Sequence, residues 1–253
     1  MGDRRIILEH APGREDILVI RLNRPEKLNA LDLDMWKKLG VLVGSACSSD
    51  ARGVILTGTG RAFSAGDDIN AMLALDTLDE ARRFFRTLAG TMEAIALCPK
   101  PVAAAVNGIA AGGGAEMLLL VDYVTAVPEA MIGYPETSLG LIPPLLATVG
   151  TVTLGLKTAR RLALAGAWLT AEEARKLGIV DEITSDPLGA AVKTVEGFHA
   201  TPGQSLASVK RLQYEALRAM LDRAVEELAR LVVTDEARAR MGSFLESRGG
   251  RRQ

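Results

Sequence analysis

Two glutamates and two glycine-bearing turns are the parts of this 253-residue sequence whose residue types could do chemistry. Glu116 lies three residues after Gly113 among apolar neighbours, and Glu136 follows Pro135 at the end of an apolar segment. Carboxyl groups in apolar surroundings have raised pKa values and can exchange protons near neutral pH. Each glutamate is equally consistent with a carboxylate at a helix start or a loop edge, because sequence spacing does not show that two side chains meet.

The two turns, Ala65 to Ile69 and Gly112 to Gly114, each follow a predicted strand and lead into a predicted helix. Backbone amides at helix starts point outward and carry the positive end of the helix dipole. Two such amides that converge on one oxygen form an oxyanion hole, which stabilises a transition state by about 3 kcal/mol per donor. Glycine lets the backbone approach a ligand closely. Taken alone, either turn is better explained as an ordinary loop than as part of an oxyanion hole.

The remaining inventory excludes several classes of enzyme. His10 and His199 are the only histidines, and Ser64 lies in a segment that lacks the first glycine of a G-x-S-x-G nucleophile turn. The Gly58–Gly60 turn is followed by Phe63, which breaks the dinucleotide-binding pattern, and the sequence contains no phosphate-binding loop. No His or Cys cluster has metal-ligand spacing. Triad hydrolysis, hydride transfer, nucleotide hydrolysis and zinc chemistry therefore lack their residues.

Composition limits the partners and the compartment. The 30 basic and 31 acidic residues leave a net charge of −1, which gives no footprint for nucleic acid or an anionic membrane. The apolar, uncharged stretch at residues 101–115 is shorter than the roughly 20 residues that span a bilayer. Cys47 and Cys98 match no metal or redox spacing, so we interpret them as buried, free thiols in a reducing compartment. With no apolar segment of a secretory signal after Met1, the sequence predicts a soluble, cytoplasmic protein.

Strand and helix patterns alternate along the first three quarters of the chain. Strands are predicted at residues 16–22, 52–58, 101–108, 121–127 and 131–134, with helices at 31–43, 78–97 and 116–120. This alternation predicts an α/β core.

After Pro187 the pattern becomes helical. Two apolar stripes mark it, one made of Leu206, Val209, Gln213, Leu217, Met220, Ala224 and Leu228, and the other of Ala237, Met241, Phe244 and Leu245. Thr234 is placed to cap the last helix. We therefore divide the chain into a core at residues 1–190 and a C-terminal helical region at residues 191–253, which could lie over its own core or over a neighbouring subunit.

Taken together, the motifs resemble the crotonase, or enoyl-CoA hydratase/isomerase, family. The matches occur in the family's order and lie at residues 22–31, 62–69, 107–116 and 135–143. A later stretch, residues 166–180, and the helical end with Phe244 and Leu245 also look like the family. The resemblance covers roughly residues 5 to 247, and the four motifs are specific as a set.

The resemblance implies a spiral of β-β-α units, assembled through the C-terminal helices as homotrimers or homohexamers. It implies that the amides of Asp67 and Gly113 hold a thioester oxygen, that Glu116 activates water and that Glu136 delivers a proton. Coenzyme A would enter as part of the acyl-CoA substrate, with no prosthetic group. The implied coenzyme A groove is lined by Lys27, Leu28, Ala30, Ala65, Asp68, Ile69, Ile109 and Gly140.

Two departures from the family's pattern keep alternatives open. Pro143, Pro144, Leu145 and Leu146 replace a glycine-rich turn, and Asn70 stands where hydratases often carry a lysine. The leading hypothesis is a 2-enoyl-CoA hydratase that uses both glutamates. A 3-enoyl-CoA isomerase would need Glu136 alone, in a pocket that Leu145 and Leu146 keep dry. A non-catalytic or RNA-binding relative would use the assembly as a scaffold, although the net charge argues against RNA.

Overall fold

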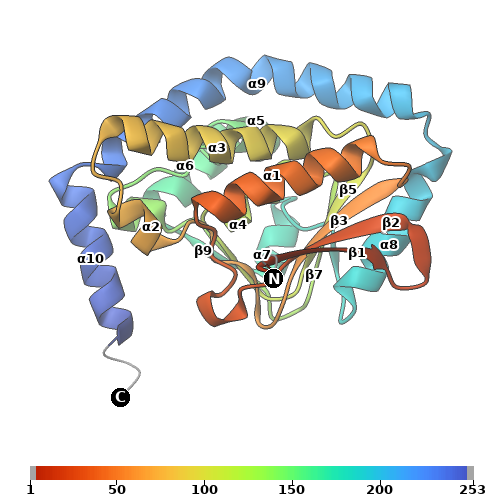
Figure 1. Cartoon of the computed structure of the whole chain (residues 1–253), viewed down its shortest axis with the longest axis horizontal. Coiled ribbons are helices and arrows are strands. Elements are labelled where there is room, and N and C mark those ends of the chain that lie inside the picture. The colour runs from red at the N-terminus through yellow and green to blue at the C-terminus, as the bar shows by residue number, and fades with distance from the viewer. Residues whose placement is uncertain (1–3, 250–253) are drawn as a thin grey trace.

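Two β-sheets and the helices around them make up the structure, a computed structural model that describes residues 4–249 (Figure 1). The larger sheet has six strands in the order β1-β2-β3-β5-β7-β10, and the smaller has four in the order β4-β6-β8-β9. Their bounds are β1 Ile6–Ala11, β2 Arg14–Leu22, β3 Gly53–Gly58, β4 Ala62–Ser64, β5 Val102–Val106, β6 Ile109–Ala111, β7 Tyr123–Ala126, β8 Met131–Gly133, β9 Trp168–Thr170 and β10 Glu182–Ile183.

The chain alternates between the two sheets. It passes from β3 to β4, from β5 to β6 and from β7 to β8, and each pair contributes its first strand to the large sheet and its second to the small one. Within each sheet these strands are parallel neighbours. The result is the predicted spiral of β-β-α units, so the fold class predicted from the sequence is confirmed.

Alternate side chains of the large sheet face two separate apolar cores. In β2, Leu18, Ile20 and Leu22 face the main core under the N-terminal helices, whereas Ile17 and Val19 face the other side. That second core is closed by α8, Pro187–Gly197, which packs on β3, β5 and β7. The period of two explains why these strands are apolar nearly throughout, since both faces are covered.

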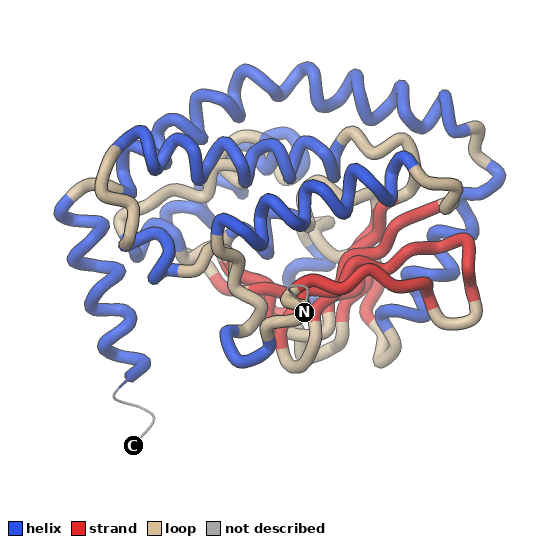
Figure 2. Tube along the Cα trace, viewed as in Figure 1, coloured by secondary structure: helices blue, strands red, loops and turns tan. Residues whose placement is uncertain are grey.

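Three long helices lie side by side above the sheets (Figures 1 and 2). They are α1, Leu33–Ser48; α3, Leu78–Ala96; and α9, Gly203–Val232, with α3 between the other two. Asp32 caps α1 by accepting from the Met35 N–H at 3.0 Å, and Thr77 and Glu80 form a capping box at the start of α3. The shorter helices are α2 Ile69–Leu73, α4 Gly113–Met117, α5 Val149–Thr153, α6 Leu156–Ala165 and α7 Ala171–Lys176, and the 3₁₀ turns are η1 Pro25–Lys27, η2 Glu136–Leu139 and η3 Phe198–Ala200.

The C-terminal region is helical, as predicted, but the buried stripe of α9 differs from the predicted one. The side chains that face the core are Lys210, Tyr214, Leu221, Val225, Leu228, Ala229 and Val232. Val209 and Met220, which belong to the predicted stripe, are 55% and 44% exposed. The apolar residues of α9 form more than one row, so periodicity alone did not identify the row that meets α3.

The last helix, α10, spans Asp235–Gly249, and the Thr234 hydroxyl accepts from the Ala237 N–H at 3.3 Å. The predicted cap is therefore confirmed. This helix descends beside α2 and η2 (Figure 1), so it covers its own core.

The prediction of free cysteines is wrong. Cys47, near the end of α1, and Cys98, just before β5, form a disulfide across 51 residues of sequence. Both side chains are buried, as expected, at 9% and 1% exposure. Spacing gave no hint of the bond because α3 lies between the two cysteines in sequence and returns the chain to the end of α1.

Strand β1 was missed in the sequence, because its alternating residues look polar around Glu9 and His10. It pairs with β2 as an antiparallel hairpin at the edge of the large sheet, turning at Gly13 with φ of 70°. The described helices include none that is long and apolar enough to cross a membrane.

Candidate active site

Three neighbouring strands of the small sheet place the predicted site segments together. Strands β4, β6 and β8 are parallel, so their carboxyl ends meet at one edge. Residues 65–68 follow β4, Gly112 and Gly113 follow β6, and Pro135 and Glu136 follow β8. Ligands of α/β proteins bind outside such strand ends. The topology therefore converts three distant motifs into one site.

A buried asparagine fixes the first of these segments. Asn29 has a left-handed backbone with φ of 57° and is fully buried. Its side chain accepts from the Arg24 N–H at 2.8 Å and donates to the Ala62 carbonyl at 2.7 Å. The Ala65 N–H then donates to the Leu28 carbonyl at 2.9 Å. The turn at residues 27–30 is thereby held against the segment that follows β4.

The two predicted oxyanion amides belong to segments in direct contact. A Cβ placed on Gly66, whose φ is +79°, would stand 2.8 Å from the Gly113 nitrogen and 2.6 Å from the Ala111 carbonyl oxygen. Only glycine fits that close approach and that backbone angle. Gly113 opens α4, so its N–H has no partner within the helix. The close contact of the two segments is what two amides that serve one oxygen require.

Glu116 is held by the unusual proline-leucine turn. The Leu145 and Leu146 N–H groups donate to its Oε1 atom at 2.7 and 3.0 Å. Its side chain is only 2% exposed, and burial raises its pKa to about 8, although both hydrogen bonds act in the opposite direction. The turn that departs from the family's pattern thus orients a predicted catalytic carboxyl.

Glu136 lies across from Glu116 with no protein partner. Neither of its carboxyl oxygens has a hydrogen-bond partner in the described chain, and its side chain is 9% exposed. Burial, and then the charge of Glu116, raise its pKa well above the usual value. A Cβ on Gly112 would stand 3.5 Å from Glu136 Oε1, so this carboxyl adjoins the oxyanion segment. It is therefore a proton-bearing group with both oxygens free for a substrate.

A third carboxyl, which sequence reasoning treated only as a backbone position, faces the same site. Asp67 Oδ1 accepts from the Trp36 indole N–H at 2.8 Å. Burial raises the pKa of Asp67 to about 7, although the bond from Trp36 favours the charged form. The neighbouring Asp68 differs, because Arg24 donates to it at 2.7 Å and its pKa is lowered. Asp67, Glu116 and Glu136 are therefore three buried carboxyl groups, each with a raised pKa, that line the same cavity.

A cavity of about 930 Å³, which we call the main cavity, opens onto these groups. Asp67, Glu116 and Glu136 line it together with seven of the eight residues predicted for the coenzyme A groove, namely Lys27, Leu28, Ala30, Ala65, Asp68, Ile69 and Ile109. Gly140 does not line it, and instead lies against α10, with the position of a Cβ 3.1 Å from the Ala237 Cα atom. Gly112 lines the main cavity, and the predicted oxyanion residue Gly113 does not.

The main cavity also has walls that no motif predicted. Apolar side chains from α2, α3, α9 and α10 contribute to it, namely Met72, Phe85, Leu88, Leu228, Phe244 and Leu245. Arg61 and Asn70 lie among its polar residues. Signals for these positions were absent because apolar residues at helical spacing look the same whether they face a core or a ligand.

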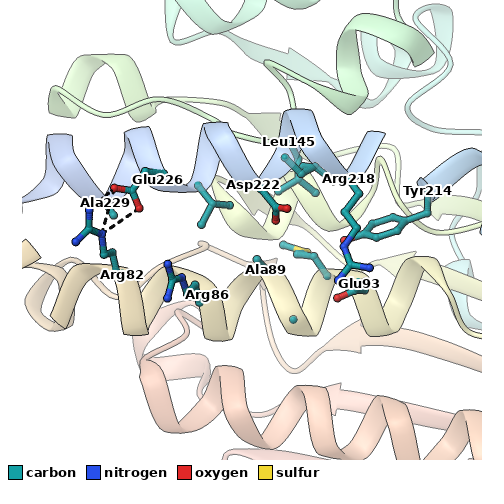
Figure 3. A pocket seen from close by; sticks show the side chains of 14 residues that line it. Arg82, Arg86, Ala89, Glu93, Leu145, Tyr214, Arg218, Asp222, Glu226 and Ala229 are labelled. Atoms are coloured by element: carbon teal, nitrogen blue, oxygen red, sulfur yellow. Dashed lines mark hydrogen bonds and ion pairs between the residues drawn. The ribbon is translucent and has the colours of Figure 1, made fainter. Parts of the chain in front are cut away.

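A second cavity lies between α3 and α9 (Figure 3). This α3–α9 groove measures about 460 Å³ and is lined by charged residues of both signs, including Arg82, Arg218 and Glu226. Arg82 pairs with Glu226 at 2.6 Å, and Arg218 lies 3.7 Å from Glu93. Leu145 faces this groove and does not line the main cavity. Because these ion pairs hold Glu226 and Glu93, and no described side chain of the groove is buried without a hydrogen-bond partner, the groove offers no proton-exchanging carboxyl like those of the main cavity.

Metal chemistry finds no support in the described residues, which contain no group of three or more His, Cys, Asp or Glu side chains placed to hold an ion. The three carboxyls of the main cavity therefore surround a space without converging on a metal position.

Comparisons with known proteins agree with this geometry. A family model described as enoyl-CoA hydratase/isomerase matches residues 13–248. The chain is 32% identical to a crotonyl-CoA hydratase of Syntrophomonas wolfei, covering 98% of this chain and 97% of that protein. It is 30% identical to a short-chain-enoyl-CoA hydratase of Clostridium acetobutylicum, covering 92% of each. A solved enoyl-CoA hydratase/isomerase of Mycobacterium paratuberculosis superposes with a TM-score of 0.85 at 28% identity, covering 95% of this chain and 98% of that one.

Proposed function

The chain belongs to the enoyl-CoA hydratase/isomerase family, and from that premise we propose that it adds water across the double bond of a 2-enoyl-CoA thioester. The single observation that carries the proposal is the pair of buried glutamates in different states. Glu116 is oriented by two N–H donors, and Glu136 has both oxygens free. Two carboxyls whose environments differ are suited to act as base and acid.

In the proposed reaction Glu116 takes a proton from the water that attacks C3, and Glu136 gives a proton to C2. The intermediate charge collects on the thioester oxygen, which the Asp67 and Gly113 amides stabilise. The carboxylate form of Glu116 is favoured by its two backbone donors, and the acid form of Glu136 by burial beside Glu116. Because burial raises both pKa values, that of Glu116 to about 8, the two groups titrate together, and the two N–H donors favour Glu116 as the carboxylate member of the pair.

Substrate binding follows from the walls of the main cavity. Lys27 and Arg61 supply cations at its polar side, suited to the phosphates of coenzyme A. The apolar side chains from α3, α9 and α10 are suited to the acyl chain. Coenzyme A would be part of the substrate, and no prosthetic group is needed. We further propose assembly as homotrimers or homohexamers through residues 191–253, where α9 exposes Val209, Leu212 and Met220.

The isomerase alternative was based on two leucine side chains that do not line the main cavity. It depended on Leu145 and Leu146 drying the pocket beside a single glutamate. Leu145 faces the α3–α9 groove, and Leu146 lies against Gly150, where a Cβ would stand 2.8 Å from Leu146 Cδ1. Both leucines contribute backbone N–H groups to Glu116 instead. An isomerase would have no need to orient that second carboxyl.

The test compares Glu116→Gln and Glu136→Gln with the wild type in hydration of crotonyl-CoA. Each amide keeps the shape of the side chain and removes its proton exchange, so we expect kcat to fall about a hundredfold or more. Urea unfolding checks that both variants fold. Wild-type rates in a folded variant would reject the proposal. Double-bond migration on a 3-enoyl-CoA, measured in parallel, would favour the isomerase if it exceeded hydration.

A further inference from the structure

The two oxygens of the Asp67 carboxyl lie in different surroundings. Oδ1 accepts from the Trp36 indole, whose side chain is fully buried in the main core. Within the described chain no other residue donates to Oδ2, which is 3.6 Å from the position of a Cβ on Gly113. The indole ring also lies against Gly113, since that same Cβ would be 3.1 Å from Trp36 Cζ2. One buried tryptophan thus orients the carboxyl so that Oδ2 faces the site.

Oδ2 consequently stands beside both predicted oxyanion donors. The carboxyl is within reach of the backbone N–H of Asp67 itself, and its Oδ2 adjoins Gly113, which supplies the other N–H. A thioester oxygen bound by those two amides would therefore contact this carboxyl. A side chain held in this way by a fixed partner is prepared to meet a ligand with its free atom.

An ionised Asp67 would oppose the reaction. Two negative charges at contact distance repel strongly in a buried site, where the effective dielectric constant is well below that of water. The titratable groups that surround the carboxyl add no cation of their own at short range. They are Glu116 from α4, Glu136 from η2 and Asp68 from its own segment. Arg24 donates to Asp68 and so compensates its charge. The other charged residues that line the cavity are Glu26, Lys27 and Arg61.

We propose that the protonated carboxyl of Asp67 donates a third hydrogen bond to the thioester oxygen, with Trp36 fixing the orientation that makes this possible. The inference rests on the proposed function, and it adds a donor to the two amides. The proton stays on Asp67 throughout, so no bond to it is broken and no co-reactant is required. A carboxylic acid kept neutral by its surroundings can serve an oxyanion in this way.

In the free protein the pKa of Asp67, about 7, lies below that of Glu116, about 8, so the proposal requires that binding of the thioester moves the negative charge of the cluster to Glu116. Its Oε1 receives two N–H bonds, at 2.7 and 3.0 Å, that remain when substrate binds, whereas the Asp67 carboxyl keeps the Trp36 N–H but gives up its own backbone amide to the substrate. When the thioester oxygen occupies the two amides, Asp67 loses that backbone donor and faces a partial negative charge. Both changes favour its protonated form. Because such groups titrate together, their pKa values belong to the set.

An isosteric substitution tests the role of the proton. In Asp67→Asn the Trp36 N–H needs an acceptor, so the amide oxygen takes the place of Oδ1 and the amide NH₂ takes the place of Oδ2. This variant therefore presents a permanent donor to the thioester oxygen. Asp67→Ala removes the donor and keeps the backbone N–H. The pair differs in the proposed hydrogen bond and leaves the two amides intact.

The measurement is kcat/KM for crotonyl-CoA from pH 5 to pH 9. We expect Asp67→Ala to lose about a hundredfold, as for removal of one oxyanion donor. Asp67→Asn should stay within about threefold of the wild type at pH 6 and exceed it at pH 9, because its donor cannot ionise. An alanine variant as fast as the wild type, or an asparagine variant as slow as the alanine one, would overturn the proposal.

A second substitution separates orientation from folding. In the double variant Trp36→Phe with Asp67→Asn, the amide loses the partner that sets its direction. We expect kcat/KM to fall about tenfold below that of Asp67→Asn alone, and the urea unfolding midpoint reports any loss of folding. An equal rate in the two would overturn the role of Trp36.

The control Glu136→Gln keeps the two proposals apart. Loss of hydration in that variant supports the proposed function whatever Asp67 does, whereas a wild-type rate rejects it. Binding of acetoacetyl-CoA, which presents a thioester oxygen without undergoing hydration, adds an independent readout. We expect Asp67→Ala to weaken its binding about tenfold at pH 6 and Asp67→Asn to keep the affinity within about threefold. Equal affinities of the wild type and Asp67→Ala would count against the third donor.

Discussion

The main cavity and the α3–α9 groove are both lined by carboxyl groups, and the two sets are in opposite states. In the groove the Glu226 carboxylate accepts a hydrogen bond from the Arg82 guanidinium at 2.6 Å, and this partner lowers the pKa of Glu226. In the main cavity Glu136 has no partner, and its pKa is raised. Figure 3 shows the arginines of the groove, with Arg82 bonded to Glu226, whereas no cation pairs with Glu136 in the main cavity as described. Burial without a cation, more than the carboxyl itself, distinguishes the site that can exchange protons.

The two regions also share a residue. The Leu145 side chain faces the groove, and its N–H holds Glu116 in the main cavity. Apolar packing between α3 and α9 thus fixes the position of a backbone donor on the opposite side of the turn. The groove therefore contributes to the site through packing, with its charges on the solvent side.

The largest expected effect concerns stability as a function of pH. The native pKa of Glu116 is raised to about 8 and that of Glu136 is raised well above 4.5, so the native state binds these protons more tightly than the unfolded chain. Their contribution to the free energy of unfolding is full below about pH 4.5 and is lost as the pH rises through the native pKa values. The double variant Glu116→Gln, Glu136→Gln should be more stable than the wild type at pH 8 by on the order of 3 kcal/mol.

Urea unfolding at pH 5 and pH 8 measures this difference, with Glu226→Gln as the groove control. The pKa of Glu226 is lowered, so its contribution has the opposite sign, being present above about pH 4.5 and lost on acidification. Some pH dependence should persist in the double variant because Asp67 also titrates, with a pKa of about 7. Parallel pH dependences for the wild type and the double variant would contradict the comparison.

A smaller effect on stability is expected at two adjacent residues, Asp67 without a cation and Asp68 with one. Asp68 is paired with Arg24 at 2.7 Å, with side-chain exposures of 9% and 16%, whereas Asp67 beside it has no cation. Arg24→Leu would leave Asp68 without its cation, as Asp67 is now, with only the hydrogen bonds from Asn70 to its Oδ1. We expect the free energy of unfolding to fall by about 2 kcal/mol at pH 8. The loss should be smaller at pH 4, because protonation of Asp68 removes the charge that has lost its cation. Arg24→Leu combined with Asp68→Asn should recover most of the loss, and a failure to recover would show that Arg24 acts through other contacts.

The smallest effect is expected in the groove. Arg82→Ala removes one partner of Glu226, but Arg230 remains at 3.4 Å and water replaces the lost guanidinium on that exposed surface. A double-mutant cycle with Glu226→Ala should give the small coupling that is usual for exposed ion pairs. Hydration of crotonyl-CoA should be unchanged, because neither residue reaches the main cavity. A tenfold loss of kcat in Arg82→Ala would show that the groove's charges are coupled to the site.

Much of the fold could be predicted from the sequence, because the apolar pattern and the residues that bound each segment indicated the same secondary structure. The strands that became β2, β3, β5 and β7 are short, apolar and bounded by polar or glycine residues, as buried parallel strands must be. Weak alternation concealed β1, and α9 has too many apolar residues for periodicity to select the row that meets α3. The Cys47–Cys98 bond needed knowledge of where α3 returns the chain.

The site divides in the same way. The sequence alone identified Glu116, Glu136 and the glycines before α2 and α4 as candidate site residues. Each could be recognised locally, from its charge or from the backbone angle that only glycine allows. Only the tertiary structure decided that Leu145 and Leu146 donate to Glu116 and that Trp36 orients the side chain of Asp67. Those bonds join residues 29 to 31 positions apart. Their reason is the parallel order of β4, β6 and β8, which brings the ends of distant segments to one edge of a sheet.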